Sequence, residues 1–258
     1  MAILVTRPEP GNAATARALR MRGHDVLLSP MLRFEAVAFQ DDGDNDCDAV
    51  ILTSANAVRA LRDAPGGQGA LSRWRALPVY AVGDRTAEAA REAGFAAVFS
   101  ADGDADALRD LLMQHVADGQ LKAGAWLCYP AGADISRDIA EDFGRDGFTV
   151  VTHTAYRMLP VAELADDVAR AFRAGGIGMV LHYSRRSARA FVAAARRAGV
   201  EVSALAVAQC CISEVVAAVL REAGAVRVIV AQTPDEDAMF AALARAAAPA
   251  PGPRASPA

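Results

Sequence analysis

Short apolar runs alternate with longer amphipathic stretches along nearly the whole chain. Runs such as Ile3–Val5 and Ala49–Leu52 have the length of buried strands, and glycine, proline or polar residues follow each of them. A stretch such as Ser187–Ala198 then places apolar residues three and four positions apart, as a helix packed on a sheet does. This alternation predicts an α/β fold with parallel sheets covered by helices on both faces.

The pattern predicts ten strands and nine helices. Expected strands are 3–5, 26–28, 49–52, 79–82, 97–99, 126–129, 149–152, 179–182, 205–208 and 227–230. Expected helices are 13–22, capped by Asn12, then 86–93, 105–115, 134–145, 164–174, 187–198, 213–223 and 235–247, with one more opening near Ser54. We expect extended connectors at 32–37 and 156–160, loops at 41–48 and 65–69, and a disordered Pro/Ala-rich tail at 249–258.

The order of these elements occurs twice. Arg91–Gly94 recurs as Arg221–Gly224, which is 130 residues later, and a second spacing of 124 residues relates 3–34 to 127–158. Periods this long indicate a duplicated domain, since solenoid repeats are much shorter. Two similar α/β lobes imply a cleft between them, and ligands usually bind in clefts between domains.

Composition narrows the class of protein. With 258 residues, a net charge of −4 and a pI near 5.6, the chain has room for about two domains and no overall positive field for nucleic acid or an anionic membrane. The sequence has no long apolar run that could cross a bilayer and no signal peptide, so we expect a cytoplasmic protein.

The four cysteines give no signature of a bridge or a metal site. Cys47, Cys128, Cys210 and Cys211 show no C-x-x-C spacing, and two of them are adjacent. This spacing fits neither a disulfide framework nor a zinc site. We therefore expect four buried free thiols in a reducing compartment.

Several strand ends carry hydroxyls or arginines just before a helix begins. Helix N-termini offer unpaired N–H groups and a partial positive charge, which suit anions. The candidate turns are 6–8, 54–56, 83–86, 131–133, 184–187 and 213–214. Their recurrence at matched strand ends favours a polyanion site between the lobes, and simple helix capping is the alternative for each turn taken singly.

Missing motifs count against several enzyme classes. The chain has no G-x-G-x-x-G after its first strand, no P-loop and no G-x-S-x-G, which removes the main support for dinucleotide, nucleoside triphosphate and hydrolase chemistry. His24, His115, His153 and His182 lack metal-ligand spacing, so each is expected at the surface or satisfied in the core.

Seven segments together carry a family resemblance. They are Val5–Pro8, Leu52–Val58, Ala81–Ala87, Tyr129–Asp134, Tyr156, Tyr183–Ala188 and Asp235–Ala238. In this order and spacing they resemble the uroporphyrinogen-III synthase family over residues 2–245. The resemblance implies two flavodoxin-like parallel-sheet lobes joined by two extended connectors, one lobe formed by 1–36 with 159–248 and the other by 37–158. The repeat alone would place a single boundary near residue 120.

The resemblance also implies a reaction. A lyase of haem (porphyrin) biosynthesis would close the linear tetrapyrrole hydroxymethylbilane into uroporphyrinogen III, with inversion of ring D and loss of water. No cofactor or metal is implied, and helix starts and arginines would bind the many carboxylates of the substrate. We expect a monomer, whose one further partner could be hydroxymethylbilane synthase in a transient contact.

The resemblance assigns site residues by position. Tyr156 corresponds to the family's connector tyrosine and is the candidate proton donor, although it could simply be an amphipathic residue of a linker. The substrate-binding candidates are Arg7, Ser54, Ala55, Asn56, Gly83, Thr86, Gly132, Ser184, Arg185 and Ser213. Arg7 has the alternative role of closing the first turn. Val216 and Ala131 depart from the family pattern, where threonine and arginine are frequent.

Two other classes of protein remain as alternatives. A non-enzymatic two-lobe protein that binds or senses a small anion would share the fold and the anion turns, although such binders usually carry a signal peptide. A two-lobe glycosyltransferase would need a metal-binding D-x-D beside a strand end. Asp102–Asp106 has that spacing, but it precedes a helix and is better interpreted as its cap.

Overall fold

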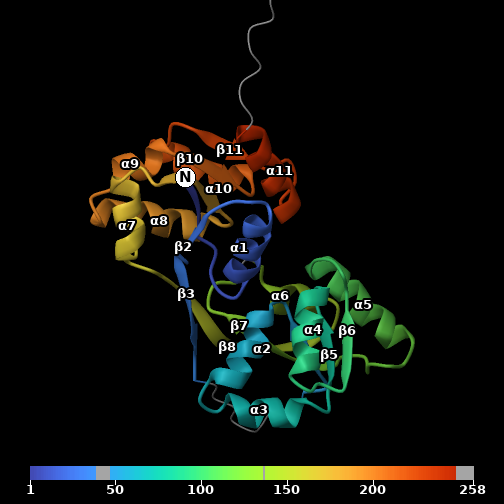
Figure 1. Cartoon of the computed structure of the whole chain (residues 1–258). Coiled ribbons are helices and arrows are strands. Elements are labelled where there is room, and N and C mark those ends of the chain that lie inside the picture. Colours follow the sequence, from blue (N-terminus) through green and yellow to red (C-terminus); the bar gives the residue numbers. More distant parts are fainter. Residues whose placement is uncertain (39–46, 136, 248–258) are drawn as a thin grey trace, which may run out of the picture. The chain divides into compact units, whose positions relative to one another are not determined.

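A computed structural model describes residues 1–38, 47–135 and 137–247 of the chain (Figure 1). The predicted tail and most of the predicted loop at 41–48 lie outside the described residues. The chain forms two compact units. Unit 1 contains Met1–Arg33 and the chain from Leu159 onward, and unit 2 contains Phe34–Met158.

Unit 1 is built on a sheet of five parallel strands in the order β11-β10-β9-β1-β2. The strands are β1 (Ala2–Val5), β2 (Val26–Leu28), β9 (Ile177–His182), β10 (Ala208–Cys211) and β11 (Val228–Val230). The helices are α1 (Gly11–Met21), α7 (Asp166–Arg173), α8 (Arg185–Arg197), α9 (Glu201–Ala206), α10 (Glu214–Glu222) and α11 (Glu236–Ala247).

Unit 2 is built on a six-stranded sheet in the order β3-β8-β7-β4-β5-β6. The strands are β3 (Leu32–Ala36), β4 (Ala49–Leu52), β5 (Pro78–Ala81), β6 (Ala97–Ser100), β7 (Trp126–Gly132) and β8 (Thr149–Pro160). The helices are α2 (Ala55–Asp63), α3 (Gly67–Trp74), α4 (Asp84–Glu92), α5 (Ala105–Ala117) and α6 (Ile139–Gly144). The chain passes between the units within β3 and again within β8.

The predicted duplication is confirmed by the order of the strands. The series β2-β1-β9-β10-β11 of unit 1 corresponds, strand by strand, to β8-β7-β4-β5-β6 of unit 2. In unit 1, β1 and β2 come from the first half of the sequence, and β9, β10 and β11 come from the second half. In unit 2, β7 and β8 come from the second copy of the repeat, and β4, β5 and β6 come from the first. The two copies have therefore exchanged their opening strand–helix–strand segments.

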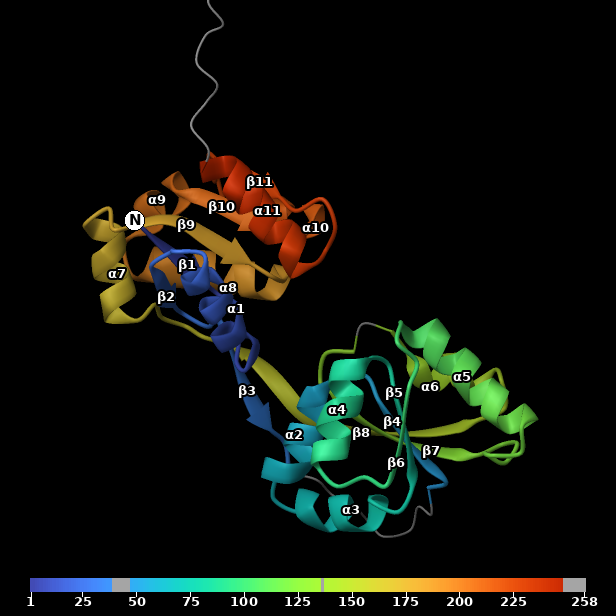
Figure 2. The same cartoon turned by 45° about the vertical axis from the view of Figure 1, so that its right-hand side comes forward.

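Each sheet buries both faces, because parallel strands carry apolar side chains on either side. In unit 1, Leu4 and Val180 pack toward the α7–α10 side, whereas Val5 and Leu181 pack with residues of α1 and α11. Figure 2 shows these helices around the sheet of unit 1. In unit 2, helices α2, α3 and α4 cover one face, and α5 and α6 cover the other. Most strands lead at their carboxyl ends into a loop and then a helix.

Three local predictions were wrong. The expected loop at 65–69 contains the start of α3, and the expected strand at 205–208 is largely α9, with β10 starting at Ala208. Helix α1 begins at Gly11 rather than after Asn12, because the Asn12 N–H already donates to the Pro8 carbonyl at 3.2 Å.

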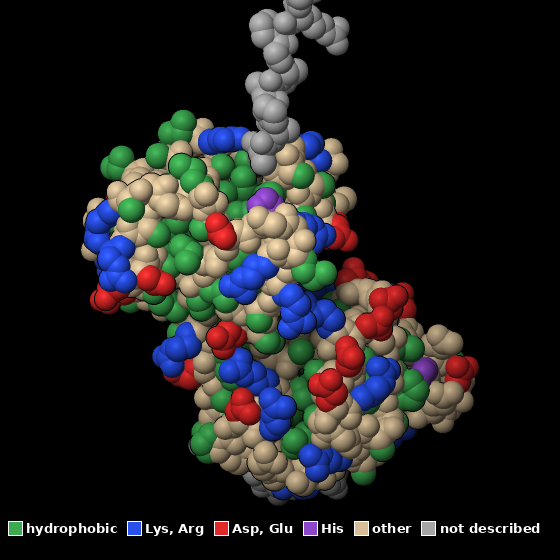
Figure 3. Space-filling view, viewed as in Figure 1, with side chains coloured by type: hydrophobic (Ala, Val, Ile, Leu, Met, Phe, Trp, Pro, Cys, Tyr) green, Lys and Arg blue, Asp and Glu red, His purple; other side chains and the backbone are tan. Residues whose placement is uncertain are grey.

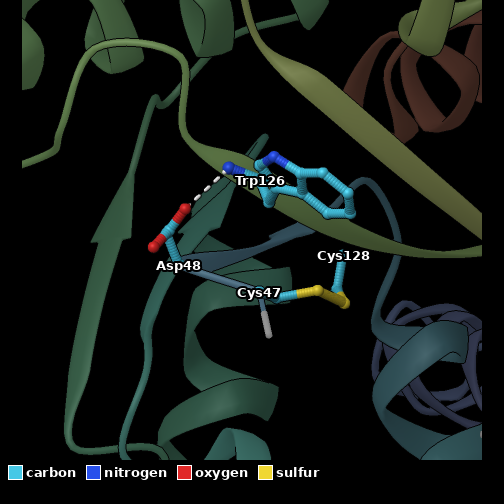
Figure 4. The surroundings of a disulfide bond; sticks show 4 residues. All are labelled: Cys47, Asp48, Trp126 and Cys128. Carbon is cyan, nitrogen blue, oxygen red and sulfur yellow. Dashed lines mark hydrogen bonds between the residues drawn. A yellow bond between two sulfur atoms is a disulfide. The ribbon is translucent and has the colours of Figure 1, made fainter. Parts of the chain in front are cut away.

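The expectation of four free thiols was also wrong. Cys47 and Cys128 form a disulfide with their Cα atoms 5.8 Å apart, whereas Cys210 and Cys211 are free and buried. The two bridged residues are 81 positions apart in the sequence, but β4 and β7 are neighbours in the sheet. Beside the bridge, the Trp126 N–H donates to Asp48 at 2.8 Å (Figure 4). Strand pairing, which sequence spacing does not show, brings these cysteines together.

Within the described ranges, none of the helices has both the length and the apolar character needed to cross a membrane.

Candidate functional site

The strand order defines where a ligand is expected in each unit. In a doubly wound parallel sheet, ligands bind beyond the carboxyl ends of the strands, where the strand order reverses. That point lies between β1 and β9 in unit 1, and between β7 and β4 in unit 2. Polar side chains occupy both positions.

In unit 2, the hydroxyls of Thr53 and Tyr129 bridge the reversal point. Thr53 follows β4 and Tyr129 lies in β7, and their oxygen atoms are 3.1 Å apart. Burial raises the pKa of the Tyr129 phenol; the Thr53 hydrogen bond opposes this change and the nearby Tyr156 phenol adds to it.

Tyr156 lies on β8, directly opposite Gly132 of β7. Its ring stacks on Phe34 with a centroid distance of 5.6 Å and an interplanar angle of 24°. It also packs against the apolar cluster that contains Leu52 and Cys128. The side chain is half-buried.

The start of α2 lies beside Tyr156. Ser54 caps this helix by accepting a hydrogen bond from the Asn56 N–H at 3.2 Å, and Ala55 is the first helical residue. The Asn56 side-chain amide approaches the sulfur of Met158, two residues after Tyr156, at 3.9 Å. The structure thus brings together five predicted site residues of unit 2: Ser54, Ala55, Asn56, Gly132 and Tyr156.

Gly83 and Thr86 belong to the next strand end along the same edge. Gly83 caps α4, and its carbonyl accepts the Thr86 N–H at 3.0 Å. Thr86 is only 7% exposed, so its hydroxyl offers little surface to a ligand. The Ala87 N–H donates to the same Gly83 carbonyl at 3.1 Å.

In unit 1, Arg7 belongs to a polar cluster at the reversal point. Its guanidinium donates to Glu236 at 3.2 Å and to Thr15 at 3.3 Å, and lies 4.7 Å from the centre of the Tyr183 ring. The Tyr183 and Thr15 hydroxyls both donate to the same Glu236 oxygen. Burial raises the pKa of Tyr183, which keeps the phenol neutral and able to donate. The positive charge of Arg7 is therefore already paired within the protein.

Ser184, Arg185 and Ser213 lie at the neighbouring strand ends of unit 1. Ser184 caps α8 through the Ser187 N–H at 3.1 Å, and Arg185 is the first residue of that helix, with an exposed side chain. Ser213 occupies the cap position of α10 but makes no capping hydrogen bond with its side chain. The main chain joins these ends, since the Ile212 N–H donates to the His182 carbonyl at 3.0 Å.

Sequence reasoning missed six members of these clusters: Thr15, Phe34, Thr53, Tyr129, Tyr183 and Glu236. Thr53, Tyr129, Tyr183 and Glu236 lie inside segments that carried the family resemblance, whereas Thr15 and Phe34 lie outside them. A rule that polar or aromatic residues ending neighbouring parallel strands meet at one edge would have found Tyr129 and Tyr183. No sequence signal joins Glu236 to Arg7 across 229 positions.

His182 departs from the expectation of a satisfied core histidine. Its Nε2 lies 2.9 Å from the Gln209 Oε1, and since the Gln209 amide nitrogen donates to backbone carbonyls, Nε2 carries the proton. The other ring nitrogen, Nδ1, is buried and has no partner among the described residues. Burial lowers the pKa of His182 to about 4, with the Gln209 hydrogen bond acting in the opposite direction, so the ring is neutral. In the part of the chain that the structure describes, no three His, Cys, Asp or Glu residues gather as metal ligands would.

Arginines are spread over the surface and have acidic neighbours. Figure 3 shows basic and acidic side chains interspersed on the visible face. Arg137, for example, contacts Asp106 at 2.7 Å and Asp142 at 2.5 Å. The hydrogen bond from Arg137 lowers the pKa of the Asp106 carboxyl.

These features define a duplicated parallel α/β protein. Each of its two units has hydroxyls and helix N-termini at the carboxyl ends of its strands, an arrangement suited to an anionic small molecule. Residues 13–241 match the family described as uroporphyrinogen-III synthase HemD. Two solved structures of such synthases are similar over 95% of this chain. The synthetase from Helicobacter pylori matches over 98% of its own length, with 17% identity and a TM-score of 0.60. A mutant synthase from Thermus thermophilus also matches over 98% of its length, with 19% identity and a TM-score of 0.52. A comparison with curated proteins found no match.

The chain belongs to the uroporphyrinogen-III synthase family. It is an enzyme of tetrapyrrole synthesis, a cyclising lyase, so the non-enzymatic and glycosyltransferase alternatives fall away.

Proposed function

We propose that this chain closes hydroxymethylbilane into uroporphyrinogen III, with inversion of ring D and loss of water. The observation that carries the proposal is the family match over residues 13–241. The arrangement of Tyr156 and the helix starts supports it. The same proposal takes the enzyme to work as a monomer in the cytoplasm, where the substrate arrives by diffusion or through a transient contact with hydroxymethylbilane synthase.

Substrate carboxylates are bound at the open edges of the two sheets. In unit 2 the donors are the main-chain N–H groups at Ala55 and Gly83, with the side chains of Ser54 and Asn56. In unit 1 they are the helix starts at Ser184, Arg185 and Ser213. Each N-terminus adds a partial positive charge that favours a carboxylate by about 0.3–1 kcal/mol. Many such contacts can hold a polyanion without a strongly basic surface.

Arg7 contributes a charged contact of a different kind. Its pairing with Glu236 fixes the guanidinium in place, and donors of the planar group outside that pair can meet a carboxylate. A fixed arginine loses less side-chain freedom on binding than a mobile one does. Such a group selects the orientation of the substrate more than it adds to affinity.

Tyr156 donates a proton to the departing hydroxyl of the substrate. The phenol stands at the carboxyl edge of unit 2, half-buried and held by Phe34, so it can meet the substrate in a defined orientation. The remaining requirement is that the substituted end of ring D is brought to the site of attack, which is an effect of proximity and orientation. We expect that effect to supply most of the rate.

The test of this proposal is the Tyr156→Phe variant with freshly made hydroxymethylbilane as substrate. Loss of a general acid is expected to lower kcat by about a hundredfold, while unfolding in urea stays unchanged. The type III isomer is separated from type I, which forms without the enzyme.

Tyr80→Phe is the matched control. It removes a phenol of the same unit, one that lies 2.9 Å from the His115 ring in the core, and should leave kcat as it is. If the Tyr156→Phe enzyme forms the type III isomer at the normal rate, Tyr156 is not the proton donor. If the unaltered protein forms no type III isomer, the proposed reaction itself is wrong.

A further inference from the structure

We propose that Gly132 and Phe34 are positioning residues that hold the Tyr156 ring in its working orientation. The inference rests on the proposed role of Tyr156. It also gives Gly132 a task other than the contact with a substrate carboxylate that the sequence resemblance implies.

Gly132 leaves the space that the Tyr156 ring occupies. A Cβ atom built on Gly132 would lie 2.9 Å from Cζ, 3.0 Å from Cε2 and 3.0 Å from the hydroxyl oxygen of Tyr156. These distances are well below ordinary carbon contacts of about 3.5–4.0 Å, so any side chain here must displace the phenol. Because the contact reaches the hydroxyl itself, the displacement affects the atom that would transfer the proton.

The backbone at Gly132 gives no other reason for a glycine. Its φ lies outside the left-handed region that disfavours other residues, whereas Gly124 and Gly147 of the same unit have φ values of 70° and 93°. Alanine is therefore compatible with the main chain at 132. The close approach of the ring is the feature that requires a missing side chain.

Phe34 restrains the ring through an aromatic stack. The centroids of Phe34 and Tyr156 are 5.6 Å apart, and the Arg59 guanidinium lies 4.2 Å from the centre of the Phe34 ring. An offset stack of this kind contributes about 0.5–1.5 kcal/mol beyond its buried area. Phe34 lies on β3 and Tyr156 on β8, which are neighbouring strands.

The main chain supports the same position. The register of β7 with β8 shifts between Ala131 and Gly132, so that Gly132 comes to lie opposite Tyr156. The Ala133 N–H then donates to the Tyr156 carbonyl at 2.8 Å. Irregularities of this kind commonly re-aim a side chain near an active site. Backbone, glycine and aromatic stack together fix where the phenol points.

The experiment compares Gly132→Ala with Gly144→Ala in the full-length protein. Gly144 ends α6, is exposed and has open space around its Cβ position, so alanine there should change neither the rate nor the ring. Gly132→Ala is expected to lower kcat by about a hundredfold with little change in KM, because the phenol moves by about 1 Å while carboxylate binding stays intact.

A second measurement follows the ring itself. The ring resonances of Tyr156, identified among the four tyrosines by their loss in Tyr156→Phe, should shift in Gly132→Ala and stay in place in Gly144→Ala. Phe34→Leu should shift the same resonances and lower kcat less, by about tenfold, because leucine keeps the apolar contact but loses the stack. In the Tyr156→Phe background, Gly132→Ala should cause little further loss of kcat, since both changes affect one group.

The outcomes separate this inference from the proposed reaction. Unmoved Tyr156 resonances in Gly132→Ala would overturn the positioning role, whether or not the protein makes the type III isomer. Shifted resonances with normal kcat would overturn it as well. A raised KM with unchanged kcat would instead make Gly132 a direct contact of the substrate. An unaltered protein that forms no type III isomer would contradict the proposed reaction but leave the ring measurement interpretable.

Discussion

Three serines at helix starts have different structural roles. Ser54 and Ser184 each accept a hydrogen bond from a main-chain N–H of their helix, at 3.2 and 3.1 Å, whereas the Ser213 side chain accepts none. A hydroxyl that already caps a helix stabilises the fold before any ligand arrives. The Ser213 side chain does not cap its helix, so a loss of substrate binding in a Ser213 variant can be measured without a loss of stability.

This difference predicts that two alanine substitutions affect different properties, one the stability and the other the KM. Ser184→Ala should lower the free energy of unfolding by about 1 kcal/mol, because α8 loses its cap. Ser213→Ala should leave stability nearly unchanged and raise KM if the hydroxyl meets a substrate carboxylate. Urea unfolding and steady-state kinetics on both variants measure the two effects. Equal destabilisation by the two substitutions would show that Ser213 also acts as a cap.

At the level of residues, sequence reasoning found positions better than partners. The matched turns placed Ser54, Ser184 and Ser213 correctly at helix starts. The sequence could not show that Arg7 pairs with Glu236, because that contact depends on where α11 returns to the sheet. Whether these residues bind substrate stays a prediction.

Among the elements, β4 and β7 meet at the centre of the unit 2 sheet, and the Cys47–Cys128 bridge ties them together. Ala49 and Val50 pair with Leu127 and Cys128, next to the disulfide. Asp48 adds a contact to Lys122 at 2.8 Å and accepts the Trp126 N–H. The beginnings of the two strands are therefore fixed by a covalent bond, an ion pair and a hydrogen bond.

Reduction of this bridge should weaken the fold. Closing a loop of 81 residues restricts the unfolded chain, so a reductant should lower the free energy of unfolding by about 2–4 kcal/mol. Urea titrations with and without the reductant measure the change. A Cys47→Ser variant is the control and should not respond to the reductant.

Thiol counts on the urea-denatured protein check the same point, with two free thiols expected before reduction and four after it. Four free thiols at the outset would contradict the bridge.

Elements with strong apolar periodicity were predicted well, and those without it were not. Most strands are short apolar runs and appear within a residue or two of the expected bounds. Helix α3 was missed because glycines at 66, 67 and 69 are typical of a loop, although Leu71 and Trp74 bury one face of the helix. Tertiary packing outweighs local propensity here. In α9 and β10, a continuous apolar run left helix and strand indistinguishable by pattern alone.

For the whole molecule, the internal repeat correctly predicted two copies of one sheet order. The repeat could not predict which copy supplies the first two strands of each sheet, because sequence similarity between copies does not show which strands pair. The family resemblance suggested a discontinuous lobe, with a first boundary at 36/37. The structure divides the chain at Arg33, since Phe34 packs on Tyr156 in unit 2.

Unit 2 is one continuous stretch of chain, so a fragment spanning 34–158 should fold by itself. Its strands β4 to β8 find all their partners within that stretch. A single cooperative urea transition and dispersed amide resonances are the expected results. A fragment spanning 1–125 is the matched comparison and should stay largely unfolded, because it lacks β7 and β8 and also β9, which pairs with β1. A disordered 34–158 fragment would show that unit 2 needs unit 1 in order to fold.

The exchange of opening segments also has a consequence for how the protein is made. Strands β1 and β2 leave the ribosome first, yet β9, which lies beside β1 at the middle of their sheet, begins only at Ile177. At about 5–20 residues per second, the nascent β1–α1–β2 segment waits on the order of ten seconds or more for that partner. Throughout that interval the apolar edge of β1 is exposed to other nascent chains. Unit 2, whose chain ends at Met158, can therefore fold before unit 1, which needs the chain from Leu159 onward.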